Sequence, residues 1–500
     1  MKRIRQESFA GYLTVYMTLI MAVLLSLCFA LVEGARSNAI RMETEIVTDI
    51  GLNSIFAEYH RELLKQYNLF FIDSSYGTSQ ITYKNTLEHF KHYISGNLEN
   101  DTILLYDYFY KDFLAMELKG AEFSKVSFAT DQAGVILRKR AVEAIKDDVG
   151  ITYLEKILDW MNVVEGYGLV ERNIQQEKEK IDAEIQSYDG MEVPVMETDD
   201  KNRNDEYQRP DSETKKVTVT NPTNALERNR SVGILNLVIQ DAETLSKKEV
   251  DLADFFGARK KQDNINVGNY VDASEENFIS RLMFQEYLLK YLGYYGEVKE
   301  DAALSYQVEY LIAGKDNDVE NLQSVVYRIS ALREVANAIY LFGDTEKCAA
   351  AEAMAVILAT AMALPEISTL LKTTILLAWA YAESLYDVKV LLAGGKIPLL
   401  KTTEEWHYDI ECIFTDLVET TEGGEEAGLD YTDYLRIFLG IEDIEKQTER
   451  FADIIEMDVR KTPGNSQFRI DGCIDSIEAT LLISSKYGYQ YEISRRKTYE

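Results

Sequence analysis

The first pattern in the chain is an uncharged apolar run near its start. Residues 13–32 carry no charged side chain, and a helix rising about 1.5 Å per residue over this run matches the hydrocarbon core of a bilayer, which is about 30 Å thick. Basic residues precede the run and Glu33 follows it. Because basic residues favour the cytoplasmic side, we expect a cytoplasmic tail at 1–12, a transmembrane helix at 13–32 and the bulk of the chain outside the cell.

A cleaved secretory signal peptide is the alternative interpretation of this run. The apolar region of such a peptide normally has about 7 to 15 residues and ends at a small-x-small site. This run is longer and ends in Leu31, Val32 and Glu33. Length and ending therefore favour a retained anchor and a single-pass protein of the cell membrane.

A glycine stands just before the run, in the stretch from Gly11 and Tyr12 to Tyr16. In its Gly-x-x-Thr-Val pattern this stretch resembles the processing region of pilins and pseudopilins, including the TadE-like and TadG-like proteins of tight-adherence pili, which are cut after such a glycine. The resemblance implies a processing site between Gly11 and Tyr12. Those proteins usually carry Glu at the fifth position after the cut, where this chain has Tyr16.

Apolar residues continue at helical spacing beyond the membrane. One face would carry Ala39, Ile46, Ile50, Ala57 and Leu64, which predicts a stalk helix that runs on to Tyr67. The alternative is a break near Gly34 or Gly51, because glycine is unfavourable inside a helix. In that case the segment would pack as an ordinary core helix.

The remainder predicts two extracytoplasmic domains separated by a linker. Region 33–186 carries the stalk, helical patterns at 81–95 and 131–183, and β-branched and aromatic strands within 103–128. Region 187–230 is acidic, contains three prolines and has few large apolar residues, so we interpret it as a solvated linker or loop.

Region 231–500 reads as mainly helical, with strands at its end. Alternating apolar and polar positions at 468–491 predict the terminal strands, and helical periodicity marks segments at 275–294, 301–313, 318–341, 346–363, 366–393 and 430–456. The expected fold class is α+β, predominantly helical.

Two apolar helices in this region, at 349–364 and 370–381, raise the question of a re-entrant membrane hairpin. Charged residues interrupt both runs, among them Glu352, Lys372 and Glu383. A charge at mid-bilayer costs about 2.5 to 3.5 kcal/mol even on a mild insertion scale. We therefore favour a buried helical hairpin packed through its alanines.

Charge and cysteine usage exclude several classes of protein. Lys and Arg total 53 against 84 Asp and Glu, a net charge of -31, which repels phosphate backbones and argues against nucleic acid as a partner. The cysteines are Cys28, Cys348, Cys412 and Cys473. Their spacing signals neither a disulfide framework nor a zinc site, and buried reduced thiols are the favoured interpretation.

The sequence offers no catalytic constellation. His89 and His92 lie three apart without a third metal ligand in view. Gly394-Gly395-Lys396 lacks the spacing of a phosphate loop and is interpreted as a helix stop, while Asp316 or Asp318 is expected to cap the next helix. We therefore expect a non-enzymatic protein with no metal, no cofactor and no small-molecule substrate.

Four stretches resemble one family of membrane-anchored proteins of Gram-positive bacteria, the domain-of-unknown-function family 5702, often encoded beside tight-adherence pilus genes. They are AEYHRELL at 57–64, YQVEYLIAGK at 306–315, Arg333-Glu334 with Asn337, and LLAGGKIPLLK at 391–401. The resemblance implies a membrane-anchored protein associated with tight-adherence pilus genes. It does not imply an activity.

Polar residues of these stretches fall on neighbouring predicted helices. Because buried charges are usually paired, we interpret the following set as a structural polar network rather than a ligand site: Glu309, Lys315, Asp318, Arg333 and Asn337.

The leading hypothesis is an accessory or pseudopilin-like component of a tight-adherence pilus or secretion apparatus, with pilus or secretion proteins as partners. The alternative is a stand-alone surface adhesin or cell-wall-binding protein. A secreted hydrolase is disfavoured, because paired carboxylates at a defined separation are not evident.

Overall fold

The computed structural model describes residues 3–98, 114–148, 150–194, 214–219, 233–239, 241–259, 277–414 and 428–499. Contacts divide the chain into two compact units. Unit 1 comprises 1–144, 255–276 and 455–500, and unit 2 comprises 145–254 and 277–454. The fold class is α+β and predominantly helical, as predicted.

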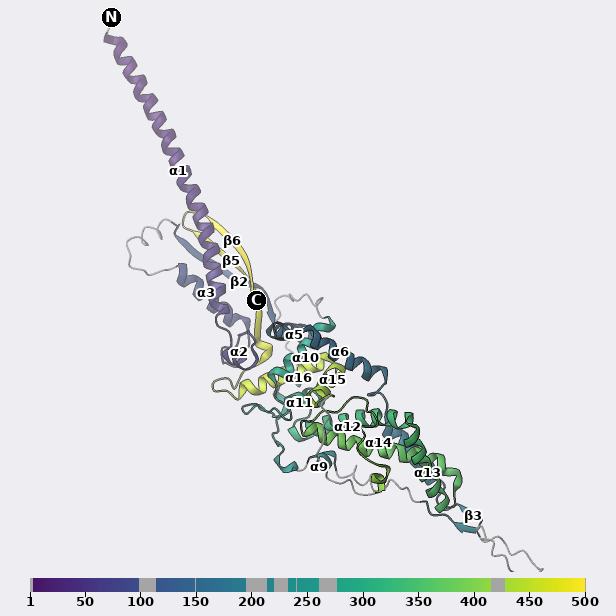
Figure 1. Cartoon of the computed structure of the whole chain (residues 1–500). Helices are drawn as coiled ribbons and strands as arrows, with labels where there is room; N and C mark the ends of the chain where they lie inside the picture. The colour runs from purple at the N-terminus through teal and green to yellow at the C-terminus, as the bar shows by residue number, and fades with distance from the viewer. Residues whose placement is uncertain are drawn as a thin grey trace, which may run out of the picture. The chain divides into compact units, whose positions relative to one another are not determined.

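The N-terminal helix of unit 1, α1 (Arg3–Phe56), runs without interruption through Gly34 and Gly51 (Figure 1). The predicted continuation to Tyr67 is wrong, because the chain leaves the helix after Phe56. A separate short helix, α2 (Arg61–Tyr67), then starts from an N-cap at His60, whose ring accepts the N–H of Leu63. The helix predicted beyond the membrane is therefore present but ends earlier.

The buried face of α1 differs from the predicted stripe. Ile46 and Ile50 are 43% and 39% exposed, whereas the buried positions follow a neighbouring line around the helix. These are Ile40, Thr44, Val47, Thr48, Leu52 and Ile55. The predicted stripe was wrong because the buried face includes two threonines. The hydroxyls of Thr44 and Thr48 donate hydrogen bonds to the carbonyls of Ile40 and Thr44, one turn earlier in the helix.

Gly51 allows a close approach between α1 and α3 (Tyr83–Leu98). A Cβ added at Gly51 would lie 2.6 Å from Cδ1 of Ile94 and 2.9 Å from the ring of Phe90. We expect Gly51→Leu to lower the free energy of unfolding by about 1 to 3 kcal/mol, the usual cost of overpacking. The matched control is Gly34→Leu, since a Cβ at Gly34 meets nothing within 4 Å. Equal thermal stability of the two purified variants would contradict this role.

The sheet of unit 1 is antiparallel and is built around a strand from near the C-terminus. Strand β5 (Cys473–Ser485) pairs with β1 (Ile72–Asp73), with β2 (Met116–Phe128) and with β6 (Gln490–Thr498). Side chains of this sheet share one apolar core with α1 and α3. The predicted terminal strands are confirmed. Of the two or three strands predicted within 103–128, β2 occupies the described part, and residues 103–113 lie outside the described residues.

Two further helices lie at the borders of unit 1. Helix α5 (Asp131–Ile145) follows β2, and regular helical backbone begins only after Gly134. The division between the units falls inside α16 (Ile444–Arg460), which leads through the short 3-10 helix η6 (Ile470–Gly472) into β5.

Unit 2 is mainly helical, with one small hairpin of β3 (Glu192–Pro194) and β4 (Thr214–Lys216). Its helices are α6 (Ile151–Gly166), α7 (Ile174–Gln186), α9 (Ile234–Val238), α10 (Phe278–Tyr291), α11 (Gln307–Ala313), α12 (Asp318–Gly343), α13 (Thr345–Ala361), α14 (Ser368–Leu392) and α15 (Tyr431–Ile441). Short 3-10 turns are η1 (Ala242–Thr244), η2 (Leu252–Asp254), η4 (Pro365–Ile367) and η5 (Ile410–Phe414).

Helix α14 is the central element of unit 2. It packs against α12, α13, α7 and α9, and its residues from Thr374 to Leu391 are almost all buried. Helix α13 packs on α14, and its residues Ala351, Ala355 and Ala359, which are spaced four apart, are fully buried. The arrangement matches the interpretation as a protein-packed hairpin, and α14 ends at Leu392 before the glycines at 394 and 395.

The predicted linker at 187–230 stays a prediction, because most of it lies outside the described residues. The described residues on both sides of it belong to unit 2.

Candidate functional site

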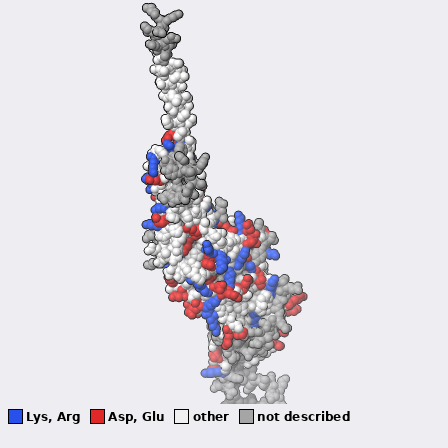
Figure 2. All heavy atoms as spheres, turned by 90° about the vertical axis from the view of Figure 1, so that its left-hand side faces the viewer, with Lys and Arg blue, Asp and Glu red and all other residues white. Residues whose placement is uncertain are grey.

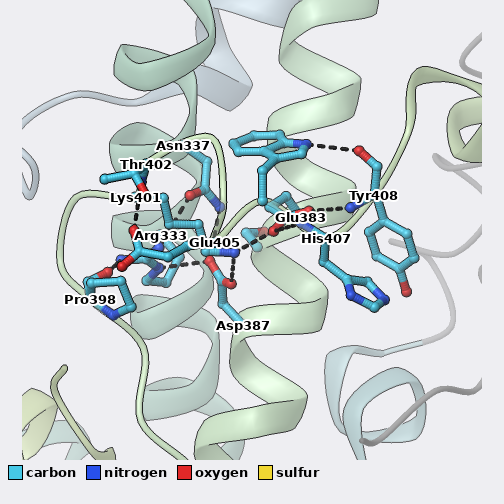
Figure 3. A network of polar contacts seen from close by, with 12 residues as sticks. Arg333, Asn337, Glu383, Asp387, Pro398, Lys401, Thr402, Glu405, His407 and Tyr408 are labelled. Carbon is cyan, nitrogen blue, oxygen red and sulfur yellow. Dashed lines mark hydrogen bonds and ion pairs between the residues drawn. The ribbon is translucent and has the colours of Figure 1, made fainter. Parts of the chain in front are cut away.

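Four buried charges of unit 2 form one connected network between α12, α14 and the chain segment that follows α14 (Figure 3). Glu383 and Asp387 stand one turn apart on α14, and Arg333 lies on α12. Lys401 belongs to the following segment. Two acids and two bases balance the charge, as burial requires.

Arg333 is fully buried and every nitrogen of its guanidinium has an acceptor. Its Nε donates to Oδ2 of Asp387 at 2.8 Å, and its Nη2 to Oδ1 of Asn337 at 3.2 Å. Its Nη1 donates to the carbonyls of Pro398 and Leu399 at 2.9 and 2.7 Å. The side chain thus joins α12, α14 and the segment after α14.

Lys401 supplies the second positive charge, pairing with Glu383 and lying 2.6 Å from Oδ1 of Asp387. Glu383 also accepts the backbone N–H groups of His407 and Tyr408, each at 3.0 Å. The His407 ring stacks on Tyr386 with centroids 3.8 Å apart. The segment from Lys401 to Tyr408 is therefore held on α14 by charge, backbone hydrogen bonds and ring stacking.

The charges of this network stabilise one another. Burial alone would raise the pKa of Asp387, but the positive charges of Arg333 and Lys401 outweigh it and hold that pKa below its ordinary value. The polar groups described above face one another rather than an open site, so we interpret the network as a structural clamp.

A second buried carboxyl, Glu309 on α11, lies among tyrosines. Its Oε1 accepts the N–H of Tyr295 at 2.8 Å and the hydroxyl of Tyr431 at 2.7 Å, while Oε2 has no hydrogen-bond partner. Burial raises the pKa of Glu309 to about 7, against the opposing effect of these two hydrogen bonds. This carboxyl is therefore poised to change its charge near neutral pH.

The five residues predicted as one polar network occupy four places. Arg333 and Asn337 meet in the clamp, and Glu309 lies among its tyrosines. Asp318 instead accepts the N–H groups of Ser305 and Tyr306. Lys315 bonds through its backbone N–H to Asn321.

The capping prediction for α12 is wrong. Its N-cap is Asn317, whose Oδ1 accepts the N–H of Glu320 at 2.8 Å. Asp318 is used elsewhere, and Asp316 accepts a side-chain bond from Asn317.

Three members of the clamp were missed in the sequence. Glu383 and Asp387 are acids four residues apart in a mainly apolar stretch of α14. This spacing places them on one face of the helix, where buried charges need partners. This spacing could have been recognised in the sequence. The pairing of the two acids with Lys401 could not have been predicted, because it depends on how the segment after α14 folds back.

The apolar part of α1 is exposed, as Figure 2 shows by a column of uncharged residues. Among the described helices, α1 alone is long and apolar enough to cross a bilayer. A helix of this kind is compatible with a single-pass anchor and also with a signal sequence. Gly11 and Tyr12 lie within its helical backbone, and Tyr12 is 79% exposed. Processing there stays a prediction.

Within the described part of the chain, no three metal-binding side chains converge. His89 contacts Glu58 at 3.1 Å and stacks near the ring of Tyr76. Cys28, Cys348 and Cys473 are free thiols, of which Cys473 is buried.

A family model matches residues 212–485, more than half of the chain, and its description is "family of unknown function (DUF5702)". The chain belongs to this family, as the resemblance implied. The match contains the stretches around Glu309, Arg333 and Lys401, so the clamp lies within the family region. The anchor and residues 57–64 lie before it. Neither the curated proteins nor the solved structures yield a match.

Proposed function

We propose that the protein is a non-enzymatic accessory or pseudopilin-like component of a tight-adherence (Tad/Flp, type IV-like) pilus or a related secretion apparatus. In this proposal α1 crosses the membrane once, with residues 1–12 in the cytoplasm and both units outside the cell. Its partners are other membrane-anchored proteins of the apparatus.

The observation that carries the proposal is that the two parts of α1 have different surroundings. Its first part is an exposed apolar span, and its second part packs on an antiparallel sheet. A long N-terminal helix of this kind resembles the stalk of pilin-like proteins. This supports a protein built to stand on the membrane through one helix.

A second observation points to partners that pack along the same helix. Met42, Ile46 and Ile50 are spaced by one turn and remain 55%, 43% and 39% exposed. An apolar stripe at this spacing is suited to contact with another helix. It continues the exposed face of α1 beyond the membrane.

The stripe gives a direct test of assembly. We expect Ile46→Glu to abolish co-purification with the other pilus proteins after cross-linking in intact cells, because a charge would be buried in the contact. Leu482→Glu is the matched control, since Leu482 is an exposed apolar residue of β5 away from the stripe. Equal recovery of partners with both variants would contradict the proposal.

Topology and processing are tested on the same cells. Protease added outside should digest the chain beyond Glu33 in intact cells, and N-terminal sequencing should give Tyr12 if the prepilin-type cut occurs. Protection of that region in intact cells would overturn the orientation.

A stand-alone adhesin or cell-wall-binding protein is the second candidate, and a polar cleft of unit 2 favours it. The cleft of about 450 Å³ is lined by amide and hydroxyl side chains, among them Asn173, Gln175, Gln323, Tyr327 and Ser330, and also by the charged residues Glu171, Arg172 and Glu334. These groups donate and accept hydrogen bonds, and the exposed Tyr327 ring adds an apolar face. A polyhydroxylated glycan fits this chemistry.

Deletion of the pilus assembly ATPase separates the two candidates. Surface display should be disturbed if the protein belongs to the apparatus, and it should be unchanged if the protein acts alone.

A further inference from the structure

The turn between β5 and β6 lies against α1 at the point where its apolar span ends. The hydroxyl of Tyr489 donates to Oε1 of Glu33 at 2.5 Å. The guanidinium of Arg36 lies 3.8 Å from the centroid of the Tyr487 ring. Two contacts from one turn thus fix it beside residues 33–36, all within unit 1.

The turn is well ordered by its own hydrogen bonds and by its neighbours. Gly488 has a φ of 88° and donates its N–H to the carbonyl of Ser485. Ser485 donates its hydroxyl to the carbonyl of Leu114, and the N–H of Lys486 reaches the carbonyl of Ala115. The turn and the start of β2 form one tip of the sheet, which cannot move far from α1.

The position of this tip relative to a bilayer follows from helix geometry. The exposed apolar part of α1 ends at Val32, so the hydrocarbon boundary lies near that residue. Four further residues rise only about 6 Å, which is the depth of the headgroup region on each side of the core. Any structure held beside residues 33–36 therefore lies among headgroups.

The side chains at the tip suit that environment. Tyr487 is 45% exposed, and Lys486 is also exposed. Tyrosine favours the membrane–water interface because its ring is apolar and its hydroxyl is polar, and basic residues attract lipid phosphate.

We infer that the β5–β6 turn, through Lys486, Tyr487 and Tyr489, is a second membrane contact that docks the sheet of unit 1 on the phospholipid headgroups. The inference rests on the proposed membrane anchor. It limits the tilt of the sheet relative to the membrane plane, because a second point of contact beside the helix resists tilting that the helix alone would allow.

The test is tryptophan quenching in the full-length protein, reconstituted in phosphatidylglycerol vesicles whose acyl chains carry bromine. Tyr487→Trp is the test variant, and Phe29→Trp, in the exposed apolar span, is the positive control. Phe70→Trp is the negative control, because Phe70 lies beside β1 at the opposite end of β5. The unchanged chain gives the background of its three tryptophans.

We expect strong quenching at position 29, intermediate quenching with a blue-shifted emission at 487, and background quenching at 70. Because the vesicles contain no other protein, quenching at 487 reports lipid and not a protein partner. Quenching at 487 equal to that at 70, with 29 still quenched, would overturn the docking and leave the anchor intact. Absence of quenching at 29 would overturn the anchor itself, and the docking with it.

Discussion

Replacing Asp387 with Asn is expected to lower the free energy of unfolding of unit 2 by about 3 to 5 kcal/mol, the cost of removing one partner from a buried ion pair. Asn keeps the shape of the side chain but removes its charge. Arg333 and Lys401 would then share a single buried acid, Glu383. The loss is large because water does not reach the unpaired positive charge.

Denaturant unfolding of the full-length protein in detergent, followed by tryptophan fluorescence, measures this loss. Trp406 reports on the clamp directly, because Nζ of Lys401 lies 5.8 Å from its ring. The matched control is Glu352→Gln, which breaks the exposed pair with Lys372. That change should cost less than about 1 kcal/mol. Similar losses for both variants would show that the clamp is not desolvated as described.

The second large effect is a pH dependence that originates at Glu309. Its pKa rises to about 7 in the folded protein from an ordinary value of 4.5, chiefly through burial. Between these values the unfolded chain has released the proton while the folded chain retains it, so stability falls as the pH rises. The difference corresponds to about 3 kcal/mol, which is fully present below pH 4.5 and lost above pH 7.

Glu309→Gln should remove this dependence. Relative to the unchanged protein, the variant is expected to gain about 3 kcal/mol of unfolding free energy between pH 5 and pH 8. Comparison of the two proteins cancels the titration of the other acids. The groups that face Glu309 are Tyr295, Tyr306, Tyr431 and the carboxylate of Asp318.

Tyr431→Phe provides a control in which the pH dependence of stability should change in the direction opposite to that of Glu309→Gln. The Tyr431 hydroxyl donates to the Glu309 carboxylate and so favours its charged form. Without it the pKa of Glu309 should rise further, and the pH dependence should become steeper. Parallel pH profiles for all three proteins would contradict the role of Glu309.

Local patterns predicted some helices of unit 2 closely, whereas the segment expected at 430–456 is two helices, α15 and α16, and the one expected at 301–313 begins only at Gln307. The segments expected at 275–294 and 318–341 correspond to α10 and α12, because helical periodicity is encoded within the segment itself. Strand β2 was harder to delimit, since its partner β5 lies more than 340 residues further along the chain. No local signal carries that pairing.

The same limit applies to the candidate site. The pairing of Arg333 and Asn337 was predictable, because residues four apart share a helix face. Their partner Asp387 lies on another helix, and the bonds from Arg333 to Pro398 and Leu399 depend on where a loop turns. The buried stripe of α1 was misassigned because threonines take part in it, and apolar periodicity gives them no weight.

The position of β5 at the centre of the unit 1 sheet has a consequence for the order of folding. Strands β1, β2 and β6 all pair with β5, whose residues are Cys473 to Ser485. Because the whole of unit 2 precedes β5 in the chain, β1 and β2 gain their partner during synthesis only after unit 2 has been made. Unit 2 can complete its helices first, since local contacts form fastest. A chain that stops before residue 473 would leave the N-terminal strands with open edges, a recognised route to aggregation.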